Sequence, residues 1–254
     1  MAFAISRLPN YGAHSRLFLT AALALVATGI GLHAHALHAI IGQADSLNLS
    51  ISNAVSLIGL QLALIGLLAA IEPTLRGMTA GLLTLAAFAS VPLGVETGAV
   101  NGLTLAWQIR AHILISMFAY GLLTAGVIVA IFALLQDHRL RAGKFASGNM
   151  LFAPLETTEK MLFGVTAVGF AALLLAVVSG FAFVEDLFAQ HLLHKTVLSL
   201  LALVLFAVLL GGRIFAGWRG KRAVYLYLWG FAILCLAYFG SRFVLEEILN
   251  RSWS

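Results

Sequence analysis

The chain has 254 residues, of which 61% are apolar and only 10% are charged, and its formal net charge at pH 7 is +5. About a quarter of the residues in a soluble domain are charged, so this composition excludes a soluble globular protein. Lipid cannot satisfy free backbone amides, and runs of about 20 apolar residues favour helices as the spanning structure. We therefore predict an all-α, polytopic integral membrane helix bundle that forms a single transmembrane domain over residues 1–254.

Seven apolar segments follow one another along the chain, separated by short polar connections. The predicted spans are residues 17–41, 52–71, 78–95, 110–136, 161–184, 195–212 and 223–241. Small-residue spacings such as Gly77-xxx-Gly81 and Gly121-xxxx-Gly126 predict close contacts between helices. After the last span, residues 241–254 form an amphipathic pattern, which predicts either an interfacial helix or a lid.

Lysine and arginine are unevenly divided between the two sets of connections. With the N-terminus inside, eleven fall on the inner side and four on the outer side. The inner residues are Arg7, Arg16, Arg76, Arg139, Arg141, Lys144, Lys160, Arg213, Arg219, Lys221 and Arg222, and the outer residues are Arg110, Lys195, Arg242 and Arg251. This positive-inside bias predicts an inner N-terminus, a periplasmic C-terminus and an odd number of spans. The basic residues thus indicate how the protein is oriented among membrane lipids. No nucleic-acid partner is expected, because the sequence has no basic patch with interleaved aromatic residues.

Six of the eight histidines gather near the outer ends of the predicted spans. They are His33, His35, His38, His112, His191 and His194. His33 lies about 200° around an ideal helix from His35, so the three histidines of the first span do not all face one ligand. Ionisable residues at membrane depth mark candidate functional sites, and neutral imidazole is the commonest metal ligand. Two interpretations stay open, namely separate interfacial or hydrogen-bonded histidines and a shared ligand site.

Haem fits this set of residues better than zinc does. A zinc enzyme needs three convergent ligands and a general base, and no outer acidic residue lies in an HExxH frame. A haem needs two axial imidazoles, an apolar slot with aromatic residues, and arginine for its propionates. We expect His112 and His194 to be the axial ligands of a non-covalent, b-type haem. The expected surrounding residues are His191, His38, Arg110, Arg242 and Trp107.

The inner segment 217–222, GWRGKR, contains Trp218, Arg219, Lys221 and Arg222. One interpretation is a positive-inside turn with an aromatic anchor, and the other is a docking or haem-entry site on the cytoplasmic side. Motifs of soluble enzymes are absent, including GxSxG, the P-loop and a nucleophile–histidine–carboxylate set. The chain is therefore not expected to be an enzyme by itself.

Four stretches together resemble a known family. They are NLSISNAVSLIGL at 48–60, AHILISMFAYGLL at 111–123, HKTVLSLLALVLFAVLL at 194–210, and LLGGRIFAGWRGKRAVYLYLWGFAILCLAYFGSRFVLEEIL in the last third of the chain. The combination covers about residues 30–250 and resembles the cytochrome c assembly protein family (the CcsA/CcmC superfamily), in its YpjD/HemX-like branch.

The resemblance implies a multi-pass protein of the bacterial inner membrane that delivers or relays haem at its periplasmic face. His112 occupies the position of the family's outer haem ligand. The tryptophan-rich haem-handling loop of the lyases is replaced by FAFVEDLFAQHLLHK, and two further lyase histidines are replaced by Gly240-Ser-Arg242 and Gly212-Arg213. Lyase activity is therefore not expected.

The partners that the resemblance suggests are other cytochrome c maturation or haem-synthesis components. Two alternatives remain from other functional classes. One is a membrane accessory protein that regulates haem biosynthesis or metal homeostasis through its inner loops at 139–160 and 217–222. The other is a small-ion transporter that uses the outer histidines, for which the spans contain few acidic residues.

Overall fold

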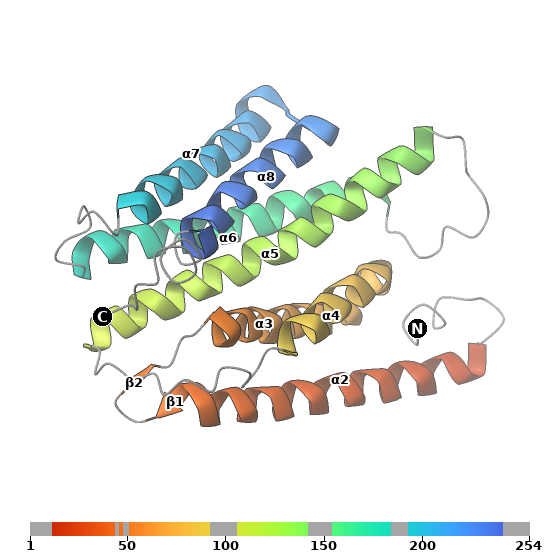
Figure 1. The fold of residues 1–254 in the computed structure, drawn as a ribbon. Coiled ribbons are helices and arrows are strands. Elements are labelled where there is room, and N and C mark those ends of the chain that lie inside the picture. Colours follow the sequence, from red (N-terminus) through yellow and green to blue (C-terminus); the bar gives the residue numbers. More distant parts are fainter. Residues whose placement is uncertain are drawn as a thin grey trace.

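The computed structural model describes residues 12–43, 46–47, 51–91, 106–141, 154–183 and 193–240 (Figure 1). Its α-helices are α2 (Gly12–Ile41), α3 (Ile51–Ile71), α4 (Arg76–Ser90), α5 (Trp107–Arg141), α6 (Leu155–Phe183), α7 (Leu193–Ala216) and α8 (Gly220–Cys235). A 3-10 turn at Pro73–Leu75 joins α3 to α4, and a π-helical turn at Leu236–Gly240 follows α8. The two-residue strands β1 (Gly42–Gln43) and β2 (Ser46–Leu47) pair antiparallel after α2.

The predicted all-α, polytopic membrane bundle is confirmed, and each predicted span contains one helix. Six helices of the described chain are long and apolar enough to cross a membrane. The exception is α4, whose 15 residues extend about 22 Å at 1.5 Å per residue, against a hydrocarbon core about 30 Å thick. The described helix α4 ends at Ser90, with Val91 as its C-cap, and the last residues of the span predicted at 78–95 lie outside the described residues. Pro92 follows and has no N–H with which to continue the helix.

Other helices extend beyond the predicted spans because polar residues continue them. α5 continues to Arg141, where the guanidinium Nε lies 2.9 Å from Oδ2 of Asp137 one turn earlier. α6 begins at Leu155 rather than 161, and its first turns contain an ion pair of 2.9 Å between Glu156 and Lys160. Such pairs stabilise exposed helix ends. A span predicted from hydropathy leaves these polar ends out.

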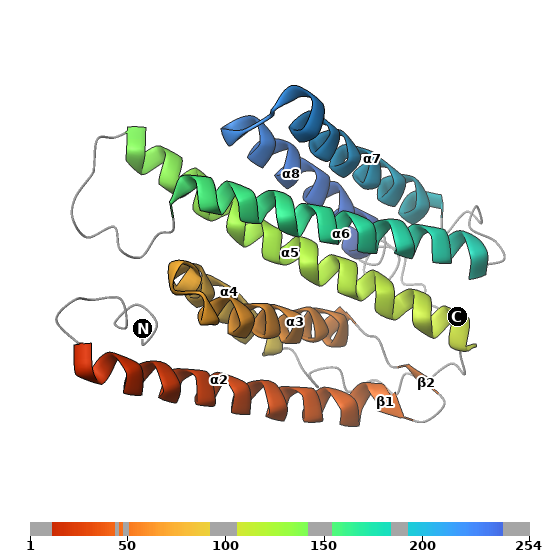
Figure 2. The ribbon, with the colours of Figure 1, turned by 180° about the vertical axis from the view of Figure 1, so that it is seen from behind.

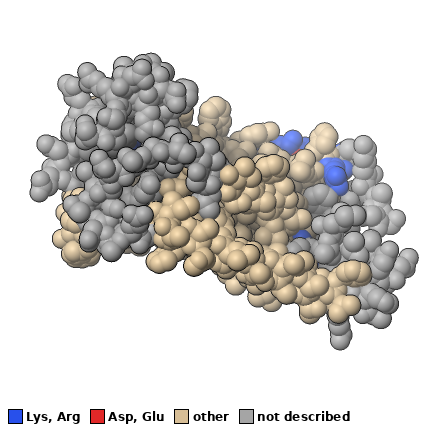
Figure 3. Space-filling view, turned by 60° about the horizontal axis from the view of Figure 1, so that its bottom comes forward, with Lys and Arg blue, Asp and Glu red and all other residues tan. Residues whose placement is uncertain are grey.

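Successive helices reverse direction, so that the bundle has two distinct ends (Figures 1 and 2). We call the end that contains Ile41, Trp107 and Leu193 the histidine end, and the opposite end, with Arg141 and Gly220, the basic end. α2 begins at the basic end and α8 leads to the histidine end, so the described chain begins and finishes at opposite ends. Figure 3 shows Lys and Arg atoms toward one end of the visible face and none across its middle, as expected for a surface in contact with lipid.

α5 lies at the centre of the bundle and contacts α3, α4, α6 and α8. Two buried tyrosines join α5 to α8 in reciprocal fashion. The Tyr120 hydroxyl donates to the Leu234 carbonyl at 2.7 Å, and the Tyr227 hydroxyl donates to the Leu123 carbonyl at 2.6 Å. A Cβ at Gly126 would overlap the Tyr227 hydroxyl, so glycine is needed where the two helices approach. The close contact predicted at this glycine is confirmed.

Candidate functional site

His112 lies in the second turn of α5, at the histidine end, and is half-buried against α6. Its Nδ1 lies 2.9 Å from the Ser179 hydroxyl, and that hydroxyl donates to the Ala176 carbonyl at 2.9 Å. Because the serine proton is used in this second bond, its oxygen accepts from an Nδ1–H of His112. This tautomer leaves the lone pair of Nε2 available for a metal ion. Gly180 provides space for the ring, since a Cβ there would lie 3.1 Å from the Cε1 atom of His112.

An aromatic pair lies at the same end of the bundle as this imidazole, at the start of α5 and the end of α6. The ring centroids of Trp107 and Phe183 are 6.3 Å apart, with their planes tilted by 55°. Trp107 is 70% exposed, and Arg110 of the same helix is half-buried. The first two turns of α5 and the end of α6 therefore carry an oriented imidazole, an aromatic pair and a guanidinium, although Arg110 lies about 200° around α5 from His112.

The other predicted ligands are not joined to His112 by any described contact. His194 is exposed in the first turn of α7, at the same end of the bundle. His191 and Arg242 lie outside the described residues, so their expected roles stay predictions. In the part of the chain that the structure describes, no three His, Cys, Asp or Glu side chains lie close enough to hold a metal ion. A site that uses one or two imidazoles is compatible with this finding, whereas a described three-ligand zinc site is not.

The histidines of α2 have separate environments. His33 is half-buried, and its Nε2 lies 2.8 Å from the Ser56 hydroxyl of α3. His35 and His38 are exposed on α2. His33 is therefore a hydrogen-bonded contact between two helices, while His38 remains accessible to a ligand approaching from outside the bundle.

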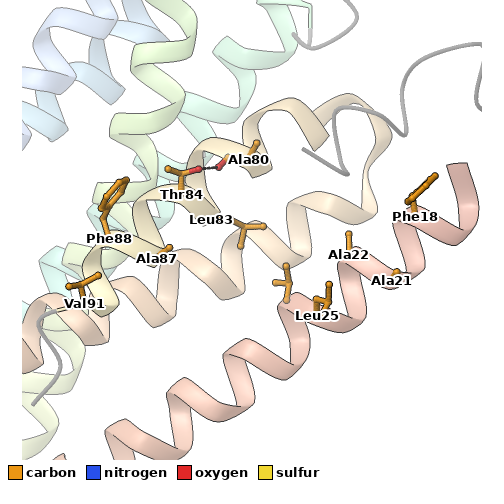
Figure 4. A pocket seen from close by; sticks show the side chains of 11 residues that line it. Phe18, Ala21, Ala22, Leu25, Ala80, Leu83, Thr84, Ala87, Phe88 and Val91 are labelled. Carbon is orange, nitrogen blue, oxygen red and sulfur yellow. Dashed lines mark hydrogen bonds between the residues drawn. The ribbon is translucent and has the colours of Figure 1, made fainter.

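An apolar cavity in the described part of the chain does not contain these residues. It lies between α2 and α4, has a volume of about 740 Å³, and is drawn in Figure 4. Its lining is apolar except for Thr84, whose hydroxyl donates to the Ala80 carbonyl of its own helix at 2.8 Å. No histidine lines it. The cavity can accommodate a hydrocarbon chain, but it presents no ligand for iron, so the candidate site is the histidine end near His112.

At the basic end, a buried carboxylate organises the turn between α7 and α8. Glu159 of α6 has a side chain only 10% exposed. Its Oε1 accepts from the Gly220 N–H at 2.9 Å, and its Oε2 accepts from Nε of Arg219 at 3.0 Å. Gly220 is the first residue of α8, and a negative charge at a helix N-terminus is stabilised by the helix dipole. Gly217 and Gly220 both have φ of +62°, a conformation that glycine adopts without strain.

Trp218 of this turn folds back over the end of α7 and is half-buried. The backbone N–H of Trp218 donates to the Gly212 carbonyl at 3.0 Å. A Cβ at Gly212 would overlap the indole ring of Trp218. Nη1 of Arg213 donates to the Trp218 carbonyl at 3.2 Å, and the Arg222 guanidinium lies 4.0 Å from the centre of the ring. The segment predicted as an anchored turn or a docking site is therefore an ordered turn that presents arginines.

Sequence reasoning missed two residues that the structure shows to matter. Ser179 carries no motif, and only the packing of α5 on α6 places it beside His112. Glu159 belongs to no motif either, yet its carboxylate contacts the start of α8. The available sequence signal for Glu159 was that this acidic residue lies further into the helix than the exposed Glu156.

Comparison with known proteins places the chain in a family. The model of the cytochrome c assembly protein family matches residues 17–249. The inner membrane protein YpjD of Escherichia coli is 33% identical over 244 residues, which cover 94% of this chain and 90% of YpjD. An uncharacterised 28.8 kDa protein of Azospirillum brasilense is 29% identical over 66% of this chain and 63% of its own length.

A more distant relative is the cytochrome c biogenesis protein CcsA of Guillardia theta. It is 24% identical over 56% of this chain and 53% of its own length. No solved structure matches. The family match spans six helices able to cross a membrane and includes both ends of the bundle. This multi-pass membrane protein therefore belongs to the cytochrome c assembly protein family.

Proposed function

We propose that this chain is a haem-handling protein of the bacterial inner membrane, and that it binds b-type haem non-covalently with His112 as an axial ligand. The observation that carries the proposal is the hydrogen bond of 2.9 Å between Nδ1 of His112 and Ser179. Metal-ligating histidines usually donate their second ring N–H to a protein acceptor, which fixes the tautomer and the ring orientation. His112 has this arrangement and keeps Nε2 available.

The surroundings of His112 suit the remaining parts of a haem. Trp107 and Phe183, at the same end of the bundle, offer aromatic faces for the macrocycle. Arg110 lies about 200° around α5 from His112, so it would have to reach a propionate from the other side of the helix. His194, at the same end of the bundle, is the proposed second axial ligand. Haem iron held by this chain would supply the redox chemistry, while the protein's own residues would bind and orient the haem.

Charge distribution supports a periplasmic location for this site. The Lys and Arg residues on the described helices are Arg16, Arg76, Arg139, Arg141, Lys160, Arg213, Arg219, Lys221 and Arg222 at the basic end, against Arg110 and Lys195 at the histidine end. Under the positive-inside rule the basic end is cytoplasmic. The histidine end and the C-terminus are then periplasmic, and the relative named as an inner membrane protein supports that membrane.

We further propose that the chain delivers or relays haem without catalysing its attachment to another protein. The support is the sequence FAFVEDLFAQHLLHK, which stands where the lyases of the family have tryptophans. A protein without its own turnover needs a donor and an acceptor of haem. These partners would be other components of haem synthesis or cytochrome c maturation.

An optical spectrum of the detergent-purified protein, expressed with supplied haem, tests the proposal. Reduction should produce sharp α and β bands, because two imidazoles hold iron in the low-spin state. His112→Ala and His194→Ala should each abolish these bands. Ser179→Ala should retain the ligand but weaken haem affinity by about 10- to 100-fold, since it removes the partner that orients the ring.

His138→Ala is the matched control, because His138 is exposed at the opposite end of α5. It should keep the wild-type spectrum. Equal haem content in the His112→Ala and His138→Ala proteins would contradict the assignment of the ligand. A flat spectrum of the wild-type protein at full recovery would contradict haem binding altogether.

A further inference from the structure

Six of the cationic side chains at the basic end fall into two electrostatic groups. Four of them pair with carboxylates of the bundle. These pairs are Arg141 with Asp137 at 2.9 Å, Lys221 with Asp137 at 3.3 Å, Lys160 with Glu156 at 2.9 Å, and Arg219 with Glu159 at 3.0 Å. Arg213 and Arg222 form no ion pair with a carboxylate among the described residues. Their positive charges are therefore uncompensated by the described chain.

These two arginines converge on one residue, Trp218. Arg213 donates to its carbonyl at 3.2 Å and also lies 4.7 Å from the centre of the Phe163 ring. Arg222 stacks over the indole at 4.0 Å. A guanidinium has five N–H donors, so each of these contacts orients the group and leaves several donors for an external acceptor. Two oriented, uncompensated guanidinium groups around one tryptophan form a site suited to a phosphate anion.

An exposed apolar surface lies beside these arginines and continues along α8 toward the middle of the membrane. Phe215, at the end of α7, is 90% exposed, and Ile214 is 74% exposed. On α8, Tyr225 and Trp229 are exposed three and seven residues after Arg222, a spacing that places them on the same face as Arg222. Cationic donors at the end of an exposed aromatic and aliphatic stripe match the two parts of a phospholipid, namely its headgroup and its acyl chains.

We infer that Arg213, Trp218 and Arg222 form a binding site for the headgroup of an anionic phospholipid on the cytoplasmic side. The two guanidinium groups bind the phosphate, and the face of α8 that exposes Tyr225 and Trp229 contacts the acyl chains. A zwitterionic headgroup is bound less tightly, because its own ammonium group opposes the arginines. Basic pockets on the cytoplasmic side of membrane helices suit anionic lipids for this electrostatic reason. The inference is independent of haem binding at the other end of the bundle.

Lipid titration of the full-length protein in detergent tests this inference. The thermal shift of the protein is measured with short-chain phosphatidylglycerol and with phosphatidylcholine, and an apparent Kd is derived for each lipid. We expect phosphatidylglycerol to bind at least tenfold more tightly. Arg222→Gln and Arg213→Gln should each weaken that binding by about tenfold, as expected for the loss of a charge-assisted contact, and should leave the affinity for phosphatidylcholine unchanged.

Lys160→Gln is the matched control, since it removes one positive charge from the same end but from a side chain already paired with Glu156. Its effect should be less than twofold. Arg222→Lys keeps the charge and loses the planar fork, so it should show an intermediate loss and provides a variant if the glutamine substitutions fail to fold. Trp218→Phe should also weaken binding, because a smaller ring supports Arg222 less well.

Three results would overturn the inference. Equal affinity of the wild-type protein for the two lipids would show that the arginines do not recognise an anionic headgroup. An acidic protein partner would then be the alternative ligand of the arginines. Equal weakening by Lys160→Gln and Arg222→Gln would show general surface electrostatics rather than a site. Displacement of the lipid by millimolar inorganic phosphate would show a site for free anions. The haem spectrum of the same samples reports on the other end, so failure of one proposal is distinguishable from failure of the other.

Discussion

Replacement of Glu159 should destabilise the bundle far more than replacement of other acidic residues in the same helix. Glu159→Ala removes the acceptor of the Gly220 N–H at 2.9 Å, a charged hydrogen bond worth about 1.5–3 kcal/mol. The negative charge at the N-terminus of α8 adds about 0.3–1 kcal/mol. The bond to Arg219 adds little, because that side chain is 56% exposed and exposed ion pairs contribute about 0–1 kcal/mol. The expected loss in free energy of unfolding is therefore about 2–4 kcal/mol.

The assay is thermal unfolding of the purified protein in detergent. For a chain of this size, each kcal/mol shifts the Tm by about 2–4 °C, so Glu159→Ala should lower the Tm by about 5–15 °C. Glu159→Gln should lower it by less, since the amide oxygen still accepts from Gly220. Glu156→Ala is the control, because it breaks only an exposed pair with Lys160, and its Tm should equal that of the wild type. Equal Tm values for Glu159→Ala and Glu156→Ala would refute this reasoning.

Two further predictions concern the contact of α5 with α8. Tyr227→Phe removes the hydroxyl that donates to the Leu123 carbonyl and should lower the free energy of unfolding by about 1 kcal/mol, measured by titration with a denaturing detergent. Gly126→Ala places a methyl group where the Tyr227 hydroxyl lies, so the helices must separate at a cost of about 1–3 kcal/mol. Gly164→Ala is its control, because no atom lies within 4 Å of the added Cβ, and it should not destabilise the protein. A Gly126→Ala protein as stable as Gly164→Ala would contradict the close approach.

The helices themselves were largely predictable, because hydropathy depends on composition within one segment. Each predicted span contains a helix, and α3 matches its prediction closely, at Ile51–Ile71 against 52–71. The ends were less predictable. α6 begins at Leu155 because an exposed ion pair stabilises polar residues that lie outside the apolar window. α4 is short because Pro92 follows it.

The candidate site was predictable in part. The sequence singled out His112 from its position at the start of an apolar segment, and the structure describes it as oriented and half-buried. It could not single out Ser179, which lies 67 residues away and belongs to no motif. The role of GWRGKR also stayed open, because the same basic residues occur in simple positive-inside turns and in binding sites.

Local chemistry therefore determined the membrane class, the number and order of helices, and the division of charge between the two ends. These properties follow from the residue types within each segment and need no contact between segments. The tertiary structure decided which side of each helix meets which neighbour. That choice pairs Tyr227 with the Leu123 carbonyl, Ser179 with His112, and Glu159 with the first N–H of α8. Such pairings depend on distances between residues that are remote in the chain. Apolar periodicity does not specify them, because the helix faces toward lipid are as apolar as the faces toward other helices.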